Sequence, residues 1–113
     1  MIIFHNMRDV PVVASEPTVR PAAWRVVRSS AGSWHLVAIV QSGSLRVTSA
    51  LQTAECASRT VVTGSGRVYE LDVGPANDPQ TVGMLMARAR LELHDGCEDI
   101  SDEVWRQMLQ STQ

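Results

Sequence analysis

The stretch Trp34–Val73 reads WHLVAIVQSGSLRVTSALQTAECASRTVVTGSGRVYELDV, and it decides the fold. Its first segment, residues 35–40, is apolar on both faces of an extended chain apart from His35. This pattern predicts a strand that is covered on both sides and lies centrally in its sheet. Residues 45–52 instead alternate apolar and polar side chains, which is typical of a strand with one face in water. The stretch therefore predicts consecutive antiparallel strands.

A hairpin closes this stretch, with a loop at residues 64–66. A three-residue loop sets Val61 opposite Tyr69 and Val62 opposite Val68, so that apolar residues meet on both faces. A loop of four residues would place an arginine opposite a valine. Because a slip of one residue turns every side chain to the wrong face, we predict the three-residue loop.

The hairpin and the strand before it also resemble a known group of proteins. The runs 46–49, 59–63 and 65–71 read RVTS, RTVVT and SGRVYEL, and they are similar to runs in small uncharacterised proteins carried in prophage regions of proteobacteria. The likeness covers the second half of the chain and brings no catalytic or binding residue with it. It implies a genomic context on a mobile element rather than an activity.

The segment before the first strand is expected to be extended. Pro11, Pro17 and Pro21 each restrain the preceding residue, which disfavours a helix. Residues 10–14 suit a short edge strand, and the arm suits docking on a second subunit, so a homo-oligomer stays open. Residues 23–28 predict a strand that forms a hairpin with the Trp34 strand.

The chain after the sheet has the signals of two helices. Asp78-Pro79 predicts a helix start, and apolar residues at a period of 3.6 continue the helix towards a stop at Gly96. A second, short helix is expected to begin with Ser101 as its N-cap and with Ile100 packed against Trp105.

These patterns together predict an α+β fold. We expect one domain over residues 1–113, made of an arm at 1–21, an antiparallel sheet of about five strands at 22–73, and two C-terminal helices within 78–111. The sheet is expected either to curl into a partial barrel or to stay open with the helices on one face.

The inventory of reactive side chains is small. All ten basic residues are arginine, and without lysine there is no Schiff-base chemistry, no Walker-type phosphate loop and no Ser–Lys dyad. Neither His5 nor His35 is accompanied by a nucleophile elbow. The loop 64–66 joins two strands, whereas phosphate loops open onto a helix. We therefore predict that the protein is not an enzyme and uses no cofactor.

The two cysteines, Cys56 and Cys97, bear on the cellular compartment. Residues 1–4 are too short for the core of a signal peptide, and no apolar run approaches a membrane span. We therefore expect a cytoplasmic protein, away from membranes, in which both thiols are free and behave as small apolar groups.

The densest group of potential metal ligands is His94-Asp95-Gly96-Cys97-Glu98-Asp99. His94 and Cys97 could hold two corners of a metal site, with a carboxylate as the third. Because no Cys-x-x-Cys or His-x-x-x-His completes the set, we interpret the stretch as a polar loop between helices and predict no metal.

Charge is unevenly divided along the chain. Residues 1–50 carry five arginines and two acids, a net charge of +3, whereas residues 51–113 carry five arginines and ten acids, a net charge of −5. We expect the acidic stretch to attract a basic partner, with Trp105 as an aromatic anchor, although a core residue is the simpler interpretation of Trp105. The predicted partner-binding residues are Glu92, Asp95, Glu98, Asp99, Asp102, Glu103 and Trp105.

The function favoured by these features is a non-enzymatic protein-interaction module. It would be an inhibitor or regulator, encoded on a phage or other mobile element, whose acidic face binds a host protein such as a nucleic-acid-handling factor. The alternative is a small sheet-based nucleic-acid-binding protein, with Arg46, Arg59 and Arg67 beside phosphates and Tyr69 stacked on bases. A pI of about 5.8 and the absence of lysine count against this alternative.

Overall fold

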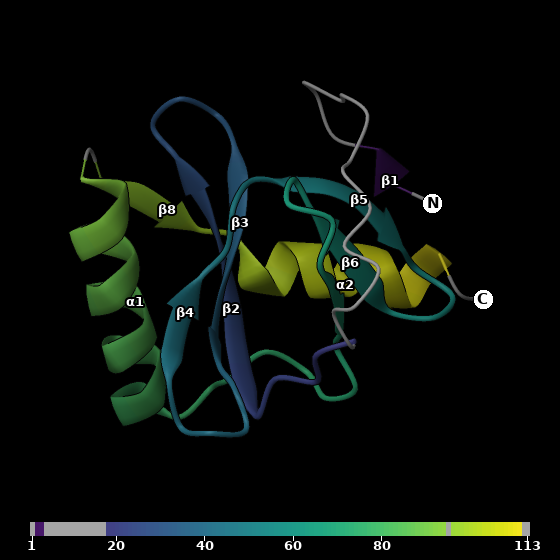
Figure 1. Ribbon diagram of the computed structural model, residues 1–113. Helices are drawn as coiled ribbons and strands as arrows, with labels where there is room; N and C mark the ends of the chain where they lie inside the picture. Colours follow the sequence, from purple (N-terminus) through teal and green to yellow (C-terminus); the bar gives the residue numbers. More distant parts are fainter. Residues whose placement is uncertain (1, 4–17, 95, 112–113) are drawn as a thin grey trace.

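The structure is a computed structural model that describes residues 2–3, 18–94 and 96–111 (Figure 1). In chain order the elements are β1 (Ile2–Ile3), β2 (Ala23–Ser29), β3 (Trp34–Ile39), β4 (Leu45–Val47), β5 (Leu51–Glu55), β6 (Thr60–Thr63), β7 (Val68–Glu70), α1 (Pro79–Leu93), β8 (Cys97–Asp99) and α2 (Ser101–Ser111). Most of the predicted arm, including the edge strand predicted at 10–14, lies outside the described residues.

The strands form two antiparallel sheets of four strands each. One sheet has the order β1-β5-β6-β7 and the other has the order β4-β3-β2-β8. The predicted α+β class with antiparallel strands is confirmed. The expectation of one sheet followed by two helices on one face was wrong, because there are two sheets, β8 lies between the helices, and α1 and α2 pack on opposite faces of the sheet β4-β3-β2-β8. There are more strands than the expected five or so, because β1 and β8 add to the edges, and within the described residues the strands do not close into one barrel.

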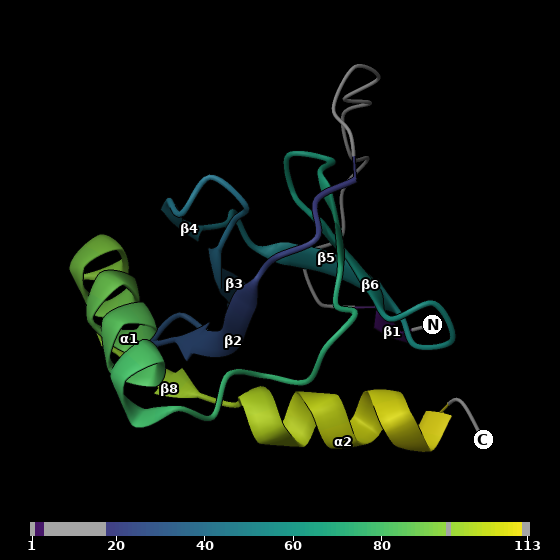
Figure 2. The ribbon, with the colours of Figure 1, turned by 90° about the horizontal axis from the view of Figure 1, so that it is seen from below.

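The layers explain why residues 35–40 are apolar on both faces. The sheet β4-β3-β2-β8 has α1 on one side and the second sheet with α2 on the other (Figures 1 and 2). Adjacent residues of β3 show the division, since Leu36 packs into the cluster that contains α2 and Val37 into the cluster that contains α1. The predicted central position of this strand is therefore confirmed.

Two apolar clusters hold these layers together. The larger one lies between the sheets and α2, and its buried members are Trp24, Val26, Leu36, Ala38, Leu51, Ala54, Cys56, Val61, Tyr69, Leu71, Ile100, Val104 and Met108. The smaller one fixes α1 to its sheet, and its buried members are Val27, Val37, Leu85, Met86 and Ala89. Each cluster removes apolar surface from water, which is the main stabilising term in folding.

The two predicted hairpins are confirmed. Strands β2 and β3 are paired antiparallel, and in the second hairpin Val61 faces Tyr69 while Val62 faces Val68. Gly66 in the loop has φ of 91°, a conformation that residues with a Cβ rarely adopt.

The start of α1 is as predicted. The carboxylate of Asp78 accepts a hydrogen bond of 2.9 Å from the backbone N–H of Thr81. The helix ends at Leu93, after which His94 takes φ of 60°. No helix in the described ranges is long and apolar enough to cross a membrane.

The prediction that Ser101 is the N-cap of α2 was wrong. The carbonyl of Ile100 already accepts the first helical hydrogen bond, from the N–H of Val104 at 3.0 Å, so the cap position is one residue earlier. The hydroxyl of Ser101 instead accepts a hydrogen bond of 2.7 Å from the backbone N–H of Val26 in β2. Ser101 therefore joins α2 to the sheet.

Candidate protein-interaction surface

A partly buried ion pair positions the first turn of α2. Arg25 of β2 binds Asp99 of β8 through Nη2 at 2.9 Å and Nε at 3.0 Å, and its Nη1 donates to the carbonyl of Ala76 at 2.6 Å. The side chain of Arg25 is only 11% exposed, so this contact is shielded from water. On its other side, Asp99 Oδ1 accepts hydrogen bonds from the hydroxyl of Ser101 at 2.6 Å and from its N–H at 3.0 Å.

These contacts change the acidity of Asp99. Burial raises the pKa of this carboxyl, but the hydrogen bonds from Ser101 and the charge of Arg25 outweigh burial and hold the pKa below its ordinary value. Asp99 is therefore a structural carboxylate that stays charged, and a partner does not need to neutralise it.

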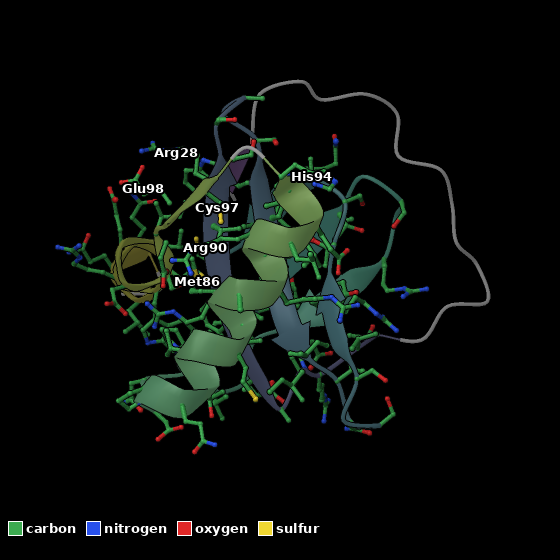
Figure 3. The ribbon with its side chains drawn as sticks, turned by 90° about the vertical axis from the view of Figure 1, so that its left-hand side faces the viewer. Arg28, Met86, Arg90, His94, Cys97 and Glu98 are labelled. Atoms are coloured by element: carbon green, nitrogen blue, oxygen red, sulfur yellow. The ribbon has the colours of Figure 1, made fainter. Side chains whose placement is uncertain are left out.

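Arginines balance much of the predicted acidic stretch. Glu92 lies on the other helix, α1, and is paired with Arg88. Glu98 is paired with Arg28 across the β2–β8 ladder (Figure 3). Asp95 lies outside the described residues. The structure therefore does not gather all the predicted acids into one surface.

Asp102 and Glu103 in the first turn of α2 are exposed to solvent, as are the arginine-paired Glu92 and Glu98. The side chain of Asp102 is 83% exposed, and it forms an ion pair of 3.7 Å with Arg25 Nη1. Exposed acids at a helix N-terminus are favourably placed relative to the helix dipole.

Trp105 is a partly buried residue that closes one side of the larger cluster. Its ring meets the edge of Trp24 with centroids 5.8 Å apart, and the guanidinium of Arg59 lies 5.4 Å from its centroid. A Cβ on Gly74 would lie 3.3 Å from the indole nitrogen, so the backbone at residue 74 packs directly on the ring. Trp105 is thus held on three sides and part of it still faces solvent.

Two exposed apolar residues lie near Trp105, one on the same helix and one beside Gly74 in the chain. Leu109, one turn further along α2, is 38% exposed, and Val73, next to Gly74, is 52% exposed. Asp102, Trp105 and Leu109 follow the spacing i, i+3, i+7, which puts them on one face of a helix. We call the group Val73, Asp102, Glu103, Trp105 and Leu109 the α2 surface.

The sequence pattern identified only part of this surface. Asp102, Glu103 and Trp105 were predicted, whereas Val73 and Leu109 were not. The helical spacing of Leu109 relative to Trp105 was the available signal. Nothing local marks Val73 as exposed.

The alternative nucleic-acid residues do not form one surface. Arg46 and Tyr69 are brought together, with Arg46 Nη1 donating to the Tyr69 hydroxyl at 3.2 Å. Arg59, however, precedes β6 and covers Trp105, whereas Arg67 precedes β7 at the other end of the hairpin. Tyr69 is 1% exposed, so its ring has no free face, and its assignment as a base-stacking residue is wrong for this conformation.

The two cysteines are both free and differ in burial. Cys56 is 3% exposed inside the larger cluster, whereas Cys97 is partly exposed in β8. His94 and Cys97 lie on different sides of the end of α1 (Figure 3). Among the described residues, which do not include Asp95, no group of three or more His, Cys, Asp or Glu could hold a metal ion.

In comparisons with known proteins, no family model, no curated protein and no solved structure matches the chain.

Proposed function

We propose that the protein is a non-enzymatic interaction module that binds another protein through the α2 surface. The observation that carries the proposal is the location of Asp102, Trp105 and Leu109 on one face of α2, beside Val73. Exposed apolar side chains with a polar rim are characteristic of protein interfaces.

Trp105 is suited to be the centre of such an interface. Trp24, Arg59 and Gly74 fix its ring, so little side-chain freedom is left to lose on binding. Buried tryptophans at the centre of a patch dominate the energy of many interfaces. Leu109 and Val73 would exclude water around it.

The charges at the rim favour a basic partner. Asp102 and Glu103 are exposed, and the Arg25–Asp99 pair fixes the turn that carries them. Rim charges act mainly on the association rate and on the choice of partner. The resemblance to prophage proteins supports a partner in the host of a mobile element, and with it a role as inhibitor or regulator.

The test uses the full chain as bait in an extract of the native host, with two matched variants. Asp102→Lys combined with Leu109→Glu alters the α2 surface, whereas Glu92→Lys makes the same kind of charge change on α1. A partner recovered by the wild type and by Glu92→Lys, but lost from the double variant, supports the proposal. Equal recovery by all three proteins would exclude the α2 surface as the contact, provided that circular dichroism shows each to be folded.

A further inference from the structure

A groove lies away from the α2 surface, between the turn that follows β3 and the segment that precedes β2. Its volume is about 280 Å³, and its lining residues are Thr18, Val19, Arg20, Val40, Gln41 and Arg46. Figure 2 shows the β3–β4 hairpin and the segment before β2 at the same side of the molecule. The groove is therefore formed where the two sheets approach each other.

Arg46 differs from Arg20, the other arginine that lines the groove. Arg20 is paired with Glu70 at 3.0 Å. Among the described residues Arg46 has no acid within ion-pair distance, and its hydrogen-bond partner is the neutral hydroxyl of Tyr69 at 3.2 Å. A partly buried guanidinium thus lines the groove with no balancing acid from the part of the chain that the structure describes.

Tyr69 gives this guanidinium a fixed position. The tyrosine is 1% exposed, and its strand β7 is paired with β6, so its hydroxyl is held by the core. Arg46 Nη1 donates to that hydroxyl, and the described residues supply no other side-chain acceptor to the guanidinium, so its other N–H groups can pair with an acceptor from a partner. Carboxylates match this geometry because two oxygens can accept from one guanidinium.

We propose that this groove binds a carboxylate side chain of an acidic peptide segment from a partner protein, with Arg46 as the residue that pairs with it. The volume lies just below the range of about 300–1,000 Å³ that is typical of pockets for drug-sized ligands, which suits one side chain better than a cofactor. Val19 and Val40 supply apolar walls for the carbon chain that carries the carboxylate.

The residues that line the groove also favour a peptide over a nucleic acid as its ligand. No aromatic residue is among the described residues that line the groove, so bases would have no stacking platform there. Arg20 is already balanced by Glu70 and lies 3.6 Å from Asp72, which limits the attraction for a chain of phosphates.

The test is an NMR titration of the full-length ¹⁵N-labelled chain with a blocked six-residue peptide of alternating Glu and Val. Its control is the same peptide with Gln in place of Glu. In the wild type we expect saturable shifts of the amides of residues 18–20 and 40–46 with the Glu peptide, and at least about tenfold weaker binding of the Gln peptide. Arg46→Met is expected to lower the affinity for the Glu peptide to that of the wild type for the Gln peptide.

Three further variants separate the pairing from a general charge effect. Arg46→Lys keeps the charge but loses the planar fork, so it should bind more weakly than the wild type. Tyr69→Phe releases the guanidinium and should weaken binding severalfold. Arg90→Met, which removes an exposed arginine from α1, should bind as the wild type does.

Several results would overturn the proposal. These are equal binding of the Glu and Gln peptides, unchanged binding by Arg46→Met in a chain whose spectrum shows it to be folded, or shifts confined to other residues. If inorganic phosphate or a single-stranded oligonucleotide binds more tightly than the Glu peptide, the groove is a phosphate site and the proposal of a peptide ligand is wrong. None of these outcomes depends on the α2 surface.

Discussion

A hydrogen bond between Arg46 and Tyr69 connects the two sheets. Arg46 Nη1 of β4 donates to the Tyr69 hydroxyl of β7 at 3.2 Å. Both strands lie at the ends of their sheets. The hydrogen bond therefore links two edges that no ladder of backbone hydrogen bonds joins within the described chain.

Tyr69→Phe tests the contribution of this link to stability. The substitution keeps the buried ring and removes the hydroxyl, so the free energy of unfolding should fall by about 1 kcal/mol. Denaturation in urea measures the change. Ser58→Ala removes an exposed hydroxyl and is the matched control, with an expected change within about 0.5 kcal/mol. Equal changes in the free energy of unfolding for Tyr69→Phe and Ser58→Ala would show that the Arg46–Tyr69 hydrogen bond does not stabilise the fold.

Asp99 is expected to make stability depend on pH in the acid range. Its pKa is lowered in the folded state, so the stability it contributes is fully present above the unfolded pKa of about 3.9 and is lost as the pH falls through the folded pKa. Asp99→Asn should cost about 2 kcal/mol at pH 7, because Arg25 loses its partner, and should flatten the loss of stability below about pH 5. Urea denaturation at a series of pH values measures the free energy of unfolding and checks both expectations. If this free energy depends on pH in the same way in the wild type and in Asp99→Asn, the lowered pKa of Asp99 is refuted.

Ser101→Ala is expected to destabilise the protein by more than the loss of a helix cap would. The side chain is 0% exposed, and its removal leaves the N–H of Val26 without its 2.7 Å acceptor inside the core. Such a group costs about 1–3 kcal/mol. Asp78→Ala, at the exposed cap of α1, gives the comparison value of about 1 kcal/mol. Thermal denaturation compares the loss of stability in the two variants. A smaller loss in Ser101→Ala than in Asp78→Ala would contradict the buried hydrogen bond of Ser101.

Gly83→Ala should stabilise the protein. Gly83 lies in the interior of α1, and a Cβ there would meet nothing within 4 Å. Alanine is favoured over glycine in helices by up to about 1 kcal/mol. Gly43→Ala is the contrasting variant, because φ of 89° disfavours any Cβ and the midpoint of unfolding should fall. A stabilised Gly43→Ala would show that the turn is different in solution.

The two thiols should react at different rates. Cys97 is partly exposed, whereas Cys56 is 3% exposed within the larger cluster. A thiol reagent is therefore expected to label Cys97 in the folded protein and Cys56 only during unfolding. Mass spectrometry after timed labelling separates the sites, with Cys97→Ser as the control that removes the fast phase. Fast labelling of both would mean that the larger cluster opens readily.

Features with a local cause could be predicted from the sequence. The register of the β6–β7 hairpin follows from the loop 64–66 and from apolar neighbours a few residues apart. The cap at Asp78 follows from the residue itself and the proline after it. Both depend on interactions across fewer than about ten positions, within which the chain has few alternatives.

Features that depend on distant contacts could not be predicted. Ser101 is a good cap residue by type, yet its hydroxyl is used by Val26, 75 positions away. Glu98 belongs to an acidic run in the sequence, but strand pairing places it beside Arg28. Part of the candidate surface was predictable because Asp102 and Trp105 share a helix, whereas the exposure of Val73 depends on how the chain leaves the sheet.

The position of α1 has a consequence for how the molecule opens. Among the described residues its apolar packing is with the smaller cluster, on the side of β2 and β3 that faces away from the larger one. We therefore expect α1 to detach as a separate cooperative unit while the contacts among the sheets and α2 persist. In that partially unfolded form Val27 and Val37 would be exposed to water, whereas Val26 and Leu36 would stay buried in the larger cluster.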